Sequence, residues 1–338
     1  ATTRRGLARS AGPGARAHRE GYRHRHPHGW RSQKPIVFRA VDQWFIKIDH
    51  VANAERGTRN AESGTPNPQP ATLNPQPGLS TFRQHALAAI DGVKWIPDWG
   101  VNRIKGAVES RPDWCISRQR TWGVPIPAFY DAAGQPILDA GIIRRVAGLI
   151  AEHGSNIWFE KSLADLWAAV RPPDWTGLVP VKKSHDTLDV WIDSGSSSRA
   201  VLMRRPELAH SALRVPSSAF DWRADVYLEG SDQHRGWFQS SLLLSLAGNG
   251  SAPFRTVLTH GFMVDADREK ISKSKQGAGG YEKPQTSEAY VKKYGADVVR
   301  LWVASQDFRN ANVVSEARVN KVSQSSRARR NGLSYQLH

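Results

Sequence analysis

Cysteine is almost absent from this 338-residue sequence, which contains Cys115 and no other. A single cysteine cannot form an internal disulfide, which excludes a disulfide-stabilised secreted domain and suits a reducing compartment. Long apolar runs are also lacking, because no stretch approaches the roughly 18 residues that a membrane-spanning helix needs. We therefore expect a soluble, cytoplasmic protein with no membrane partner.

Acidic residues are scarce relative to basic ones, with 31 Asp and Glu against 47 Lys and Arg, a net charge of +16. A strong positive field attracts polyanions, and nucleic acid is the commonest biological polyanion. A generally basic proteome would give the same excess of charge. Both interpretations stay open at this point.

The pattern of apolar and turn-forming residues divides the chain into seven segments. Asn-Pro-Gln-Pro occurs twice within the third segment, which favours an extended, solvated insertion. In chain order, we expect a disordered basic segment (1–25), the end of an insertion returning to the core (26–50), a proline-rich insertion (51–80), a core segment (81–130), a small connective insert (131–185), the main core (186–285) and the start of a helical bundle (286–338).

Residue patterns predict helices and strands in several parts of the chain. Alternating β-branched and aromatic residues over 35–49 predict strands, and a helix-like stretch covers about 81–91. Residues 95–130, rich in Trp, Pro and Arg, are expected to form loops and short strands. In the insert, we expect helices over about 141–153 and 162–170. The C-terminal pattern is helical from about 287 to 305 and again from about 315.

A strand, a helix and a second strand follow one another at about 225–229, 235–248 and 256–260. This order and spacing predict a βαβ unit of a parallel sheet, hence an α/β fold. Ligands of such sheets collect at the carboxyl ends of the strands. Glu229 to His234 and His260 to Phe262 both follow strands in this way, so we expect polar groups from the two segments to share one edge.

A short polar run, Lys270-Ile271-Ser272-Lys273-Ser274, comes soon after the second strand. Its two lysines, three residues apart, are able to bind one polyphosphate and stabilise the charge that builds as pyrophosphate leaves. A run of this kind is more often an ordinary solvated loop. Its closeness to the strand ends favours a basic loop that closes over the sheet edge.

Four ordered motifs carry a family resemblance. They are Arg111 to Pro127 (RPDWCISRQRTWGVPIP), Asp186 to Gly195 (DTLDVWIDSG), Tyr227 to Phe238, and Lys270 to Ser274. Together they resemble class I aminoacyl-tRNA synthetases, and within that class the isoleucyl enzymes. The resemblance implies the second half of a Rossmann-like nucleotide-binding fold, with a small inserted domain and the start of a C-terminal helical bundle.

The same resemblance implies an isoleucine–tRNA ligase, with L-isoleucine, ATP as its Mg²⁺ complex and tRNA(Ile) as partners. Editing is implied too, because a hydrophobic pocket separates isoleucine from valine poorly, a limit for which this family is itself the standard example. Residues that match the adenylate-holding segment are Glu229, Gly230, Asp232 and Gln233. Trp191 and Trp237 match aromatics that flank the isoleucine side chain, with ordinary core packing as the open alternative. ATP-contacting positions are matched by His260, Gly261, Ser272 and Lys273, and the catalytic pair by Lys270 and Lys273.

Several motifs and domains found in members of that family have no match in these residues. A His-Ile-Gly-His-like motif is absent, as are most of the editing insertion and the anticodon-binding domain, so we expect the chain by itself to be inactive. Ile271 stands in place of the usual Met. Gly29 and Ser32 stand where some members carry a cysteine pair, so no zinc is expected. The alternatives are a non-catalytic tRNA-binding or other nucleic-acid-binding fragment, supported by the basic charge, and a pseudogene product.

Overall fold

The computed structural model describes residues 27–29, 34–37, 40–50, 81–209, 222–265, 268, 271 and 286–337. The predicted segments 1–25 and 51–80 lie outside the described residues, as do Lys270, Ser272 and Lys273. The chain divides into two units, Ala1–Gln43 and Trp44–His338. The described part of the first unit contains an antiparallel bridge between His28 and Pro35. The finer division into seven segments stays a prediction.

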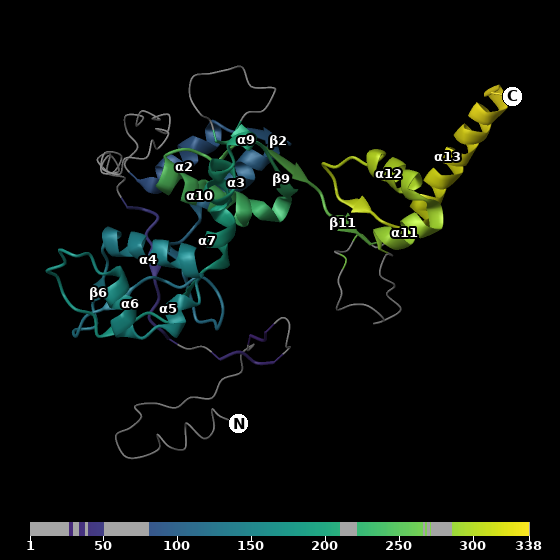
Figure 1. Ribbon diagram of the computed structural model, residues 1–338. Coiled ribbons are helices and arrows are strands. Elements are labelled where there is room, and N and C mark those ends of the chain that lie inside the picture. The colour runs from purple at the N-terminus through teal and green to yellow at the C-terminus, as the bar shows by residue number, and fades with distance from the viewer. Residues whose placement is uncertain are drawn as a thin grey trace, which may run out of the picture. The chain divides into compact units, whose positions relative to one another are not determined.

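The second unit contains a three-stranded parallel sheet (Figure 1). Its order is β2 (Lys94–Ile96), β10 (Phe254–His260) and β9 (Ala224–Gly230). Between β9 and β10 the chain forms the 3₁₀ turn η3 (Ser231–Arg235) and helix α10 (Trp237–Asn249). The predicted βαβ unit and the α/β class are therefore confirmed.

One face of this sheet carries the main core. Trp95, Tyr227 and Val257 are register neighbours on the three strands, and all three are buried. They pack with apolar side chains of α2 (Phe82–Asp91), α3 (Trp99–Glu109) and α10. On the other face Val226 and Leu228 are 52% and 54% exposed, as expected when side chains alternate along a strand.

The prediction of loops and short strands over 95–130 was wrong for Trp99–Glu109, which form helix α3. Gly100, Ile104, Ala107 and Val108 are its buried residues, and their spacing is that of one helix face. The composition of the surrounding segment obscured this period. By contrast, the helix predicted over 81–91 is confirmed as α2, which a capping box of Thr81 and Gln84 begins.

The strands predicted over 35–49 were mostly wrong, because within the described residues of that stretch only β1 (Phe45–Ile46) forms a strand. It pairs with β3 (Trp114–Cys115). Backbone amides on either side of β1 instead donate hydrogen bonds to side chains that lie far along the chain. The amide of Trp44 donates to Ser117 Oγ at 2.8 Å, and that of Ile48 donates to Asp113 Oδ1 at 2.9 Å.

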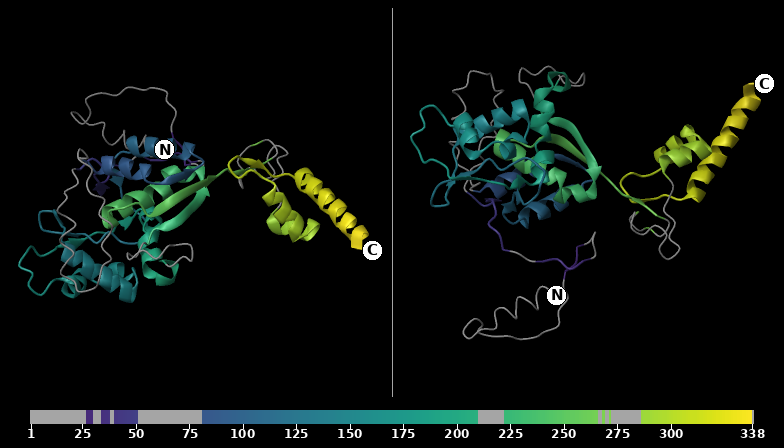
Figure 2. Two further views of the ribbon diagram at one scale, coloured as in Figure 1. Left: turned by 90° about the horizontal axis from the view of Figure 1, so that it is seen from above. Right: turned by 60° about the horizontal axis from the view of Figure 1, so that its bottom comes forward.

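The insert between the first and second resemblance motifs has its own hydrophobic core, and its helices can be followed in teal in Figure 2. Helices α4 (Ala140–His153) and α6 (Leu163–Val170) confirm the two predicted helices, and α5 (Ile157–Glu160) lies between them. A small sheet, in the order β6 (Pro136–Ile137), β5 (Phe129–Tyr130) and β7 (Lys182–Lys183), completes it. Lys183 is buried and donates to the carbonyl oxygens of Trp158 and Lys161 at 2.5 and 2.6 Å.

The insert is followed by shorter elements that lead back to the sheet. They are β8 (Thr187–Leu188), which pairs with β4 (Ser117–Arg118), then α7 (Val190–Gly195), α8 (Ser197–Ala200), η2 (Leu202–Arg204) and α9 (Pro206–Ala209).

After β10, the described residues form a parallel pair of short strands and three helices. Strand β11 (Met263–Val264) pairs with β12 (Asn312–Val313). The helix predicted over 287–305 is two helices, α11 (Ser287–Tyr294) and α12 (Ala296–Ala304), because Gly295 between them has a φ of 88°. The last helix, α13, covers Glu316–Leu337. None of the helices among the described residues is long and apolar enough to cross a membrane.

Candidate active site

The carboxyl ends of β9 and β10 lie side by side. Thr259 pairs with Glu229, and His260 pairs with Gly230. The parallel register therefore brings both predicted polar segments to the same edge of the sheet, as the sequence led us to expect. Glu229 is exposed there, and its carboxylate is free to accept hydrogen bonds from hydroxyl or amino groups.

Gly230 is a point of close approach at this edge. A Cβ atom at this position would lie 2.9 Å from Asp232 Oδ1 and 3.0 Å from Phe262 Cε1. Only glycine therefore allows the turn after β9 and the segment after β10 to come this close.

Gly236 brings Gln233 and Trp191 together. A Cβ atom on Gly236 would lie 2.5 Å from Gln233 Oε1 and 2.9 Å from Trp191 Cη2. The same Gln233 oxygen accepts a hydrogen bond of 2.9 Å from the amide of Trp237, at the start of α10. Trp191 itself is 38% exposed, so its indole leaves apolar surface open for a ligand.

Trp237 packs more tightly than Trp191. Its ring stacks on Tyr227 with centroids 4.1 Å apart and planes at 12°, and its Nε1 donates to the carbonyl oxygen of Ser194 at 2.8 Å. Burial raises the pKa of the Tyr227 hydroxyl, so that group stays neutral. Trp237 thus anchors α7 and supports the wall that Trp191 exposes.

His260 and Gly261 follow β10 directly. His260 Nδ1 lies 2.8 Å from the carbonyl oxygen of Gly261, and the Gly261 amide donates to the carbonyl oxygen of Phe308 at 2.7 Å. A Cβ atom on Gly261 would lie 2.0 Å from the Asn310 oxygen. Part of Gly261 is thus covered by the chain that leads into β12.

His234 is a site residue to which the sequence analysis gave no role. It is fully buried between the rings of Trp95, Trp99 and Phe238. Its Nδ1 lies 3.0 Å from the carbonyl oxygen of Ser231, so it holds η3 in place. Burial lowers the pKa of its imidazole, which is therefore neutral near pH 7.

Asp189 was also missed, and it joins two of the resemblance motifs. Its side chain is buried, and Oδ2 accepts from Trp114 Nε1 and pairs with Arg118 Nη2, each at 2.9 Å. Its other oxygen accepts from the amide of Trp191 at the start of α7. An Asp just before a predicted helix is a sequence signal for an N-cap, but its partners 71 and 75 residues away are not.

Sequence comparisons match the chain to a known family. The family described as tRNA synthetases class I (I, L, M and V) matches residues 31–315. The chain belongs to this family. The resemblance drawn from the four motifs is thereby confirmed.

Curated relatives extend over most of the chain. The isoleucine–tRNA ligase of Methylacidiphilum infernorum is 46% identical over 315 residues, which are 92% of this chain and 28% of that protein. The isoleucine–tRNA ligase of Geobacter sulfurreducens is 42% identical over 315 residues, 93% of this chain and 29% of that protein. The chain thus spans less than a third of the length of these relatives.

Among solved structures, the methionyl-tRNA synthetase of Mycobacterium tuberculosis bound by methionyl-adenylate covers 71% of this chain and 35% of its own, with a TM-score of 0.42 and 17% identity. A likeness this slight supports no conclusion about the site. The roles of the individual site residues stay predictions.

Proposed function

We propose that this chain forms the adenylate-holding part of an isoleucine–tRNA ligase. The whole protein would activate L-isoleucine with ATP, taken as its Mg²⁺ complex, to give isoleucyl-adenylate and pyrophosphate. It would then transfer the isoleucyl group to tRNA(Ile), in the cytoplasm. The proposal of isoleucine as the amino acid rests on the identity of 42–46% to proteins named isoleucine–tRNA ligase.

The sheet edge supports the activation step. In this reaction the carboxylate of the amino acid attacks the α-phosphate of ATP, so positioning and charge stabilisation dominate. Glu229, Gly230, Asp232 and Gln233 lie on or just after β9, where acceptors are available to the ribose hydroxyls and the amino group. Lys270 and Lys273 are proposed to bind the leaving pyrophosphate, with Ser272 donating a hydrogen bond.

Side-chain recognition is proposed to rest on Trp191. Its indole is 38% exposed beside Gly236, while Trp237 is fixed behind it by the Tyr227 stack. A flat apolar wall of this kind fits a branched aliphatic side chain and excludes charged ones. His260 and Gly261 are proposed to line the adenine side of the same edge.

The test is calorimetric binding of isoleucyl-sulfamoyl-adenosine, an unreactive adenylate analogue, to the 338-residue chain. The leucyl and methionyl analogues serve as competitors. We expect Trp191→Ala to weaken the isoleucyl analogue by about tenfold or more, because it removes a large aromatic contact. Trp122→Ala is the matched control, since this tryptophan is 85% exposed and lies outside the proposed site.

Two results would overturn the proposal. One is leucyl or methionyl analogue binding as tight as isoleucyl binding. The other is equal affinity of the Trp191→Ala and Trp122→Ala variants for the isoleucyl analogue.

A further inference from the structure

The first resemblance motif, Arg111 to Pro127, supplies none of the residues proposed to hold the adenylate or the isoleucine side chain. Residues 111–118 nevertheless contact both helices of the proposed isoleucine wall. Helix α7 starts after Asp189 and carries Trp191, whereas α10 starts with Trp237. One polar contact leads from the motif to each helix.

The contact to α7 runs through a buried carboxylate. Asp189 is 3% exposed, and a buried carboxylate is stable only where donors and cations surround it. The motif supplies both, because Trp114 Nε1 donates to Asp189 Oδ2 and Arg118 Nη2 pairs with the same oxygen, each at 2.9 Å. The other carboxylate oxygen, Oδ1, accepts from the amide of Trp191 at 3.4 Å. The motif therefore holds the first turn of α7.

Arg118 is itself fixed by the strand that carries it. Its Nη1 donates to the carbonyl oxygens of Cys115 and Ser117, at 2.9 and 2.8 Å. The backbone amide of Asp189 donates to the carbonyl oxygen of Ile116 at 2.7 Å. A planar guanidinium with acceptors on two sides has one favourable orientation. The ion pair with Asp189 therefore fixes a direction as well as a distance.

The contact to α10 comes from Arg111. Its Nη1 donates to Oε1 of Gln239, which is 2% exposed and lies in the first turn of α10. The Arg111 guanidinium also lies over the ring of Trp114, 4.8 Å from the ring centroid, within the range of a cation–π interaction. Trp114 thus has Arg111 on its face and Asp189 at its ring nitrogen. It joins the two contacts into one network.

The direction of the Trp191 indole depends on how α7 is held. This helix covers only Val190–Gly195, and so short a helix has few hydrogen bonds of its own to keep its orientation. Its last turn is tied by Trp237 Nε1, which donates to the carbonyl oxygen of Ser194 at 2.8 Å. The network around the buried carboxylate ties its first turn, so a change in that network turns the indole.

We propose that Arg118 and Asp189 are positioning residues for amino-acid recognition, which set the direction of the Trp191 indole through the first turn of α7. The inference rests on the proposed function, in which that indole is the wall for the isoleucine side chain. Neither residue contacts the ligand. Isoleucine and leucine differ only in the position of one methyl group, so a turn of the wall lowers the selection between them.

A double-mutant cycle on the 338-residue chain tests the proposal, with calorimetric affinities for isoleucyl- and leucyl-sulfamoyl-adenosine. Its variants are Arg118→Met, Trp191→Ala and the two combined. We expect Arg118→Met to weaken the isoleucyl analogue about fivefold and the leucyl analogue less than about twofold. In the Trp191→Ala background the same substitution should cost nothing further, because the indole that Arg118 positions is gone. Arg118→Lys keeps the charge beside Asp189 and should recover most of the lost affinity.

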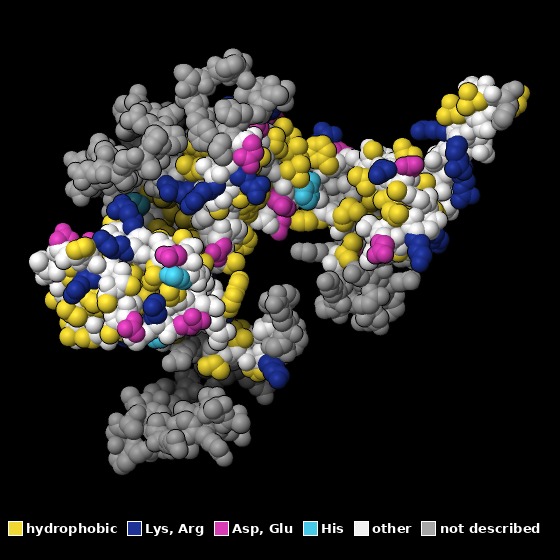
Figure 3. Space-filling view, in the orientation of Figure 1, with side chains coloured by type: hydrophobic (Ala, Val, Ile, Leu, Met, Phe, Trp, Pro, Cys, Tyr) yellow, Lys and Arg dark blue, Asp and Glu magenta, His cyan; other side chains and the backbone are white. Residues whose placement is uncertain are grey.

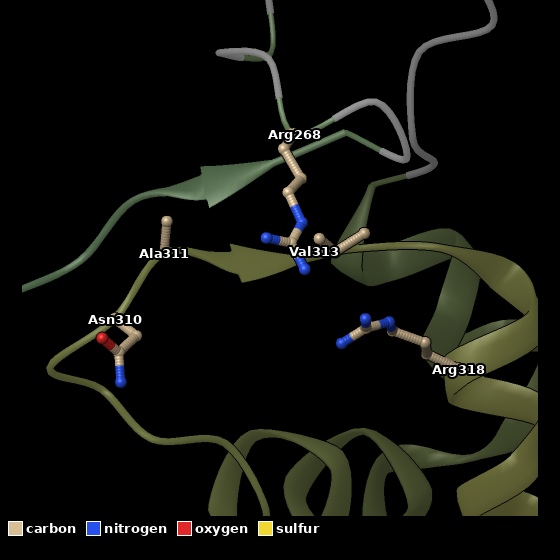
Figure 4. A pocket seen from close by; sticks show the side chains of 5 residues that line it. All are labelled: Arg268, Asn310, Ala311, Val313 and Arg318. Carbon is tan, nitrogen blue, oxygen red and sulfur yellow. The ribbon is translucent and has the colours of Figure 1, made fainter.

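Arg318→Met is the matched control. Figure 4 shows the Arg318 side chain extending from α13 toward a pocket that Asn310 and Val313 also line. Lys and Arg side chains gather along the same helix (Figure 3). The control removes one positive charge and leaves the ion pair of Asp189 intact, so both affinities should stay within about twofold of the parent.

A second measurement needs no ligand. The chain is labelled with 5-fluorotryptophan, and the fluorine resonance of Trp191 is assigned by its absence from Trp191→Ala. We expect this resonance to move in Arg118→Met, while those of Trp158 and Trp302 stay in place, since each is buried in a different hydrophobic cluster. Trp114→Phe removes only the hydrogen bond from Nε1. It is the second variant if Arg118→Met does not fold, and it should move the same resonance.

The proposal fails if Arg118→Met weakens the isoleucyl analogue equally with and without the Trp191 indole, because Arg118 would then act by another route. It also fails if the Trp191 resonance stays in place in both Arg118→Met and Trp114→Phe. A parent chain that binds the isoleucyl analogue no more tightly than the leucyl analogue refutes the proposed function. The resonance measurement then still decides whether the network sets the direction of the indole.

Discussion

At the scale of single residues, Asp189 is the side chain that joins the first and second resemblance motifs. It accepts from Trp114 and Arg118 and from the first turn of α7. We expect Asp189→Asn to lower the free energy of unfolding by about 2 kcal/mol, because a buried charge pair loses one member while Arg118 stays partly hydrated. Denaturant unfolding measures this. Asp186→Asn is the control, since Asp186 receives one bond of 3.3 Å from Gln119. An equal loss in both variants would contradict the assigned role.

His234 gives a prediction about pH. Burial lowers the pKa of its imidazole, so below the ordinary pKa of about 6.5 the unfolded chain takes up a proton that the folded chain refuses. Above that pH both states are neutral and the buried imidazole costs no stability. Below it, the free energy of unfolding decreases as the pH falls. Unfolding of the parent and of His234→Gln between pH 7.5 and 5.5 measures it. We expect a shallower pH dependence in the variant, and parallel curves would contradict the assignment.

At the scale of elements, the contact between α7 and α10 depends on Gly195. A Cβ atom there would lie 2.7 Å from Leu244 Cδ1 and 2.9 Å from the Ser240 carbonyl carbon. We expect Gly195→Ala to destabilise the fold by about 2 kcal/mol through overpacking. Gly106→Ala in α3 is the control, because nothing lies within 4 Å of its added Cβ. There the substitution should stabilise by about 0.5 kcal/mol or more. The same sign for both would contradict this packing account.

Elements set by local periodicity could be predicted from the sequence. The βαβ unit and helices α4 and α6 follow from runs and spacings of apolar residues. Helix α3 was missed although its buried residues keep helical spacing, because Trp, Pro and Arg dominate the surrounding segment. Strands over 35–49 were overpredicted because Ser117 and Asp113 take the backbone donors of that stretch. Partners this far apart in the chain, like those of Asp189, cannot be predicted from one sequence. The edge that Glu229 and His260 share could be predicted, because it follows from the order of parallel strands.

At the scale of the whole molecule, the buried side chains of the described residues form three separate hydrophobic clusters. One underlies the central sheet, one fills the insert and one joins α11, α12 and α13. Since each contains its own large aromatic residues, each is able to lose its packing while the others keep theirs. The proposed adenylate edge adjoins the first cluster, so binding at that edge is expected to respond to core substitutions in the first cluster and not to those in the third.

Hydrogen exchange tests that separation. Trp302 is buried in the third cluster with Tyr290, Val298 and Val319, and Trp302→Leu should leave a gap that costs about 2 kcal/mol. We expect faster amide exchange in α11 to α13 and unchanged exchange in β2, β9 and β10. Trp158→Leu is the reciprocal control, since its ring is buried in the insert. There, exchange should rise in α4 to α6 alone. If either substitution raised exchange across all three clusters, the clusters would unfold as one unit, which would contradict their separation.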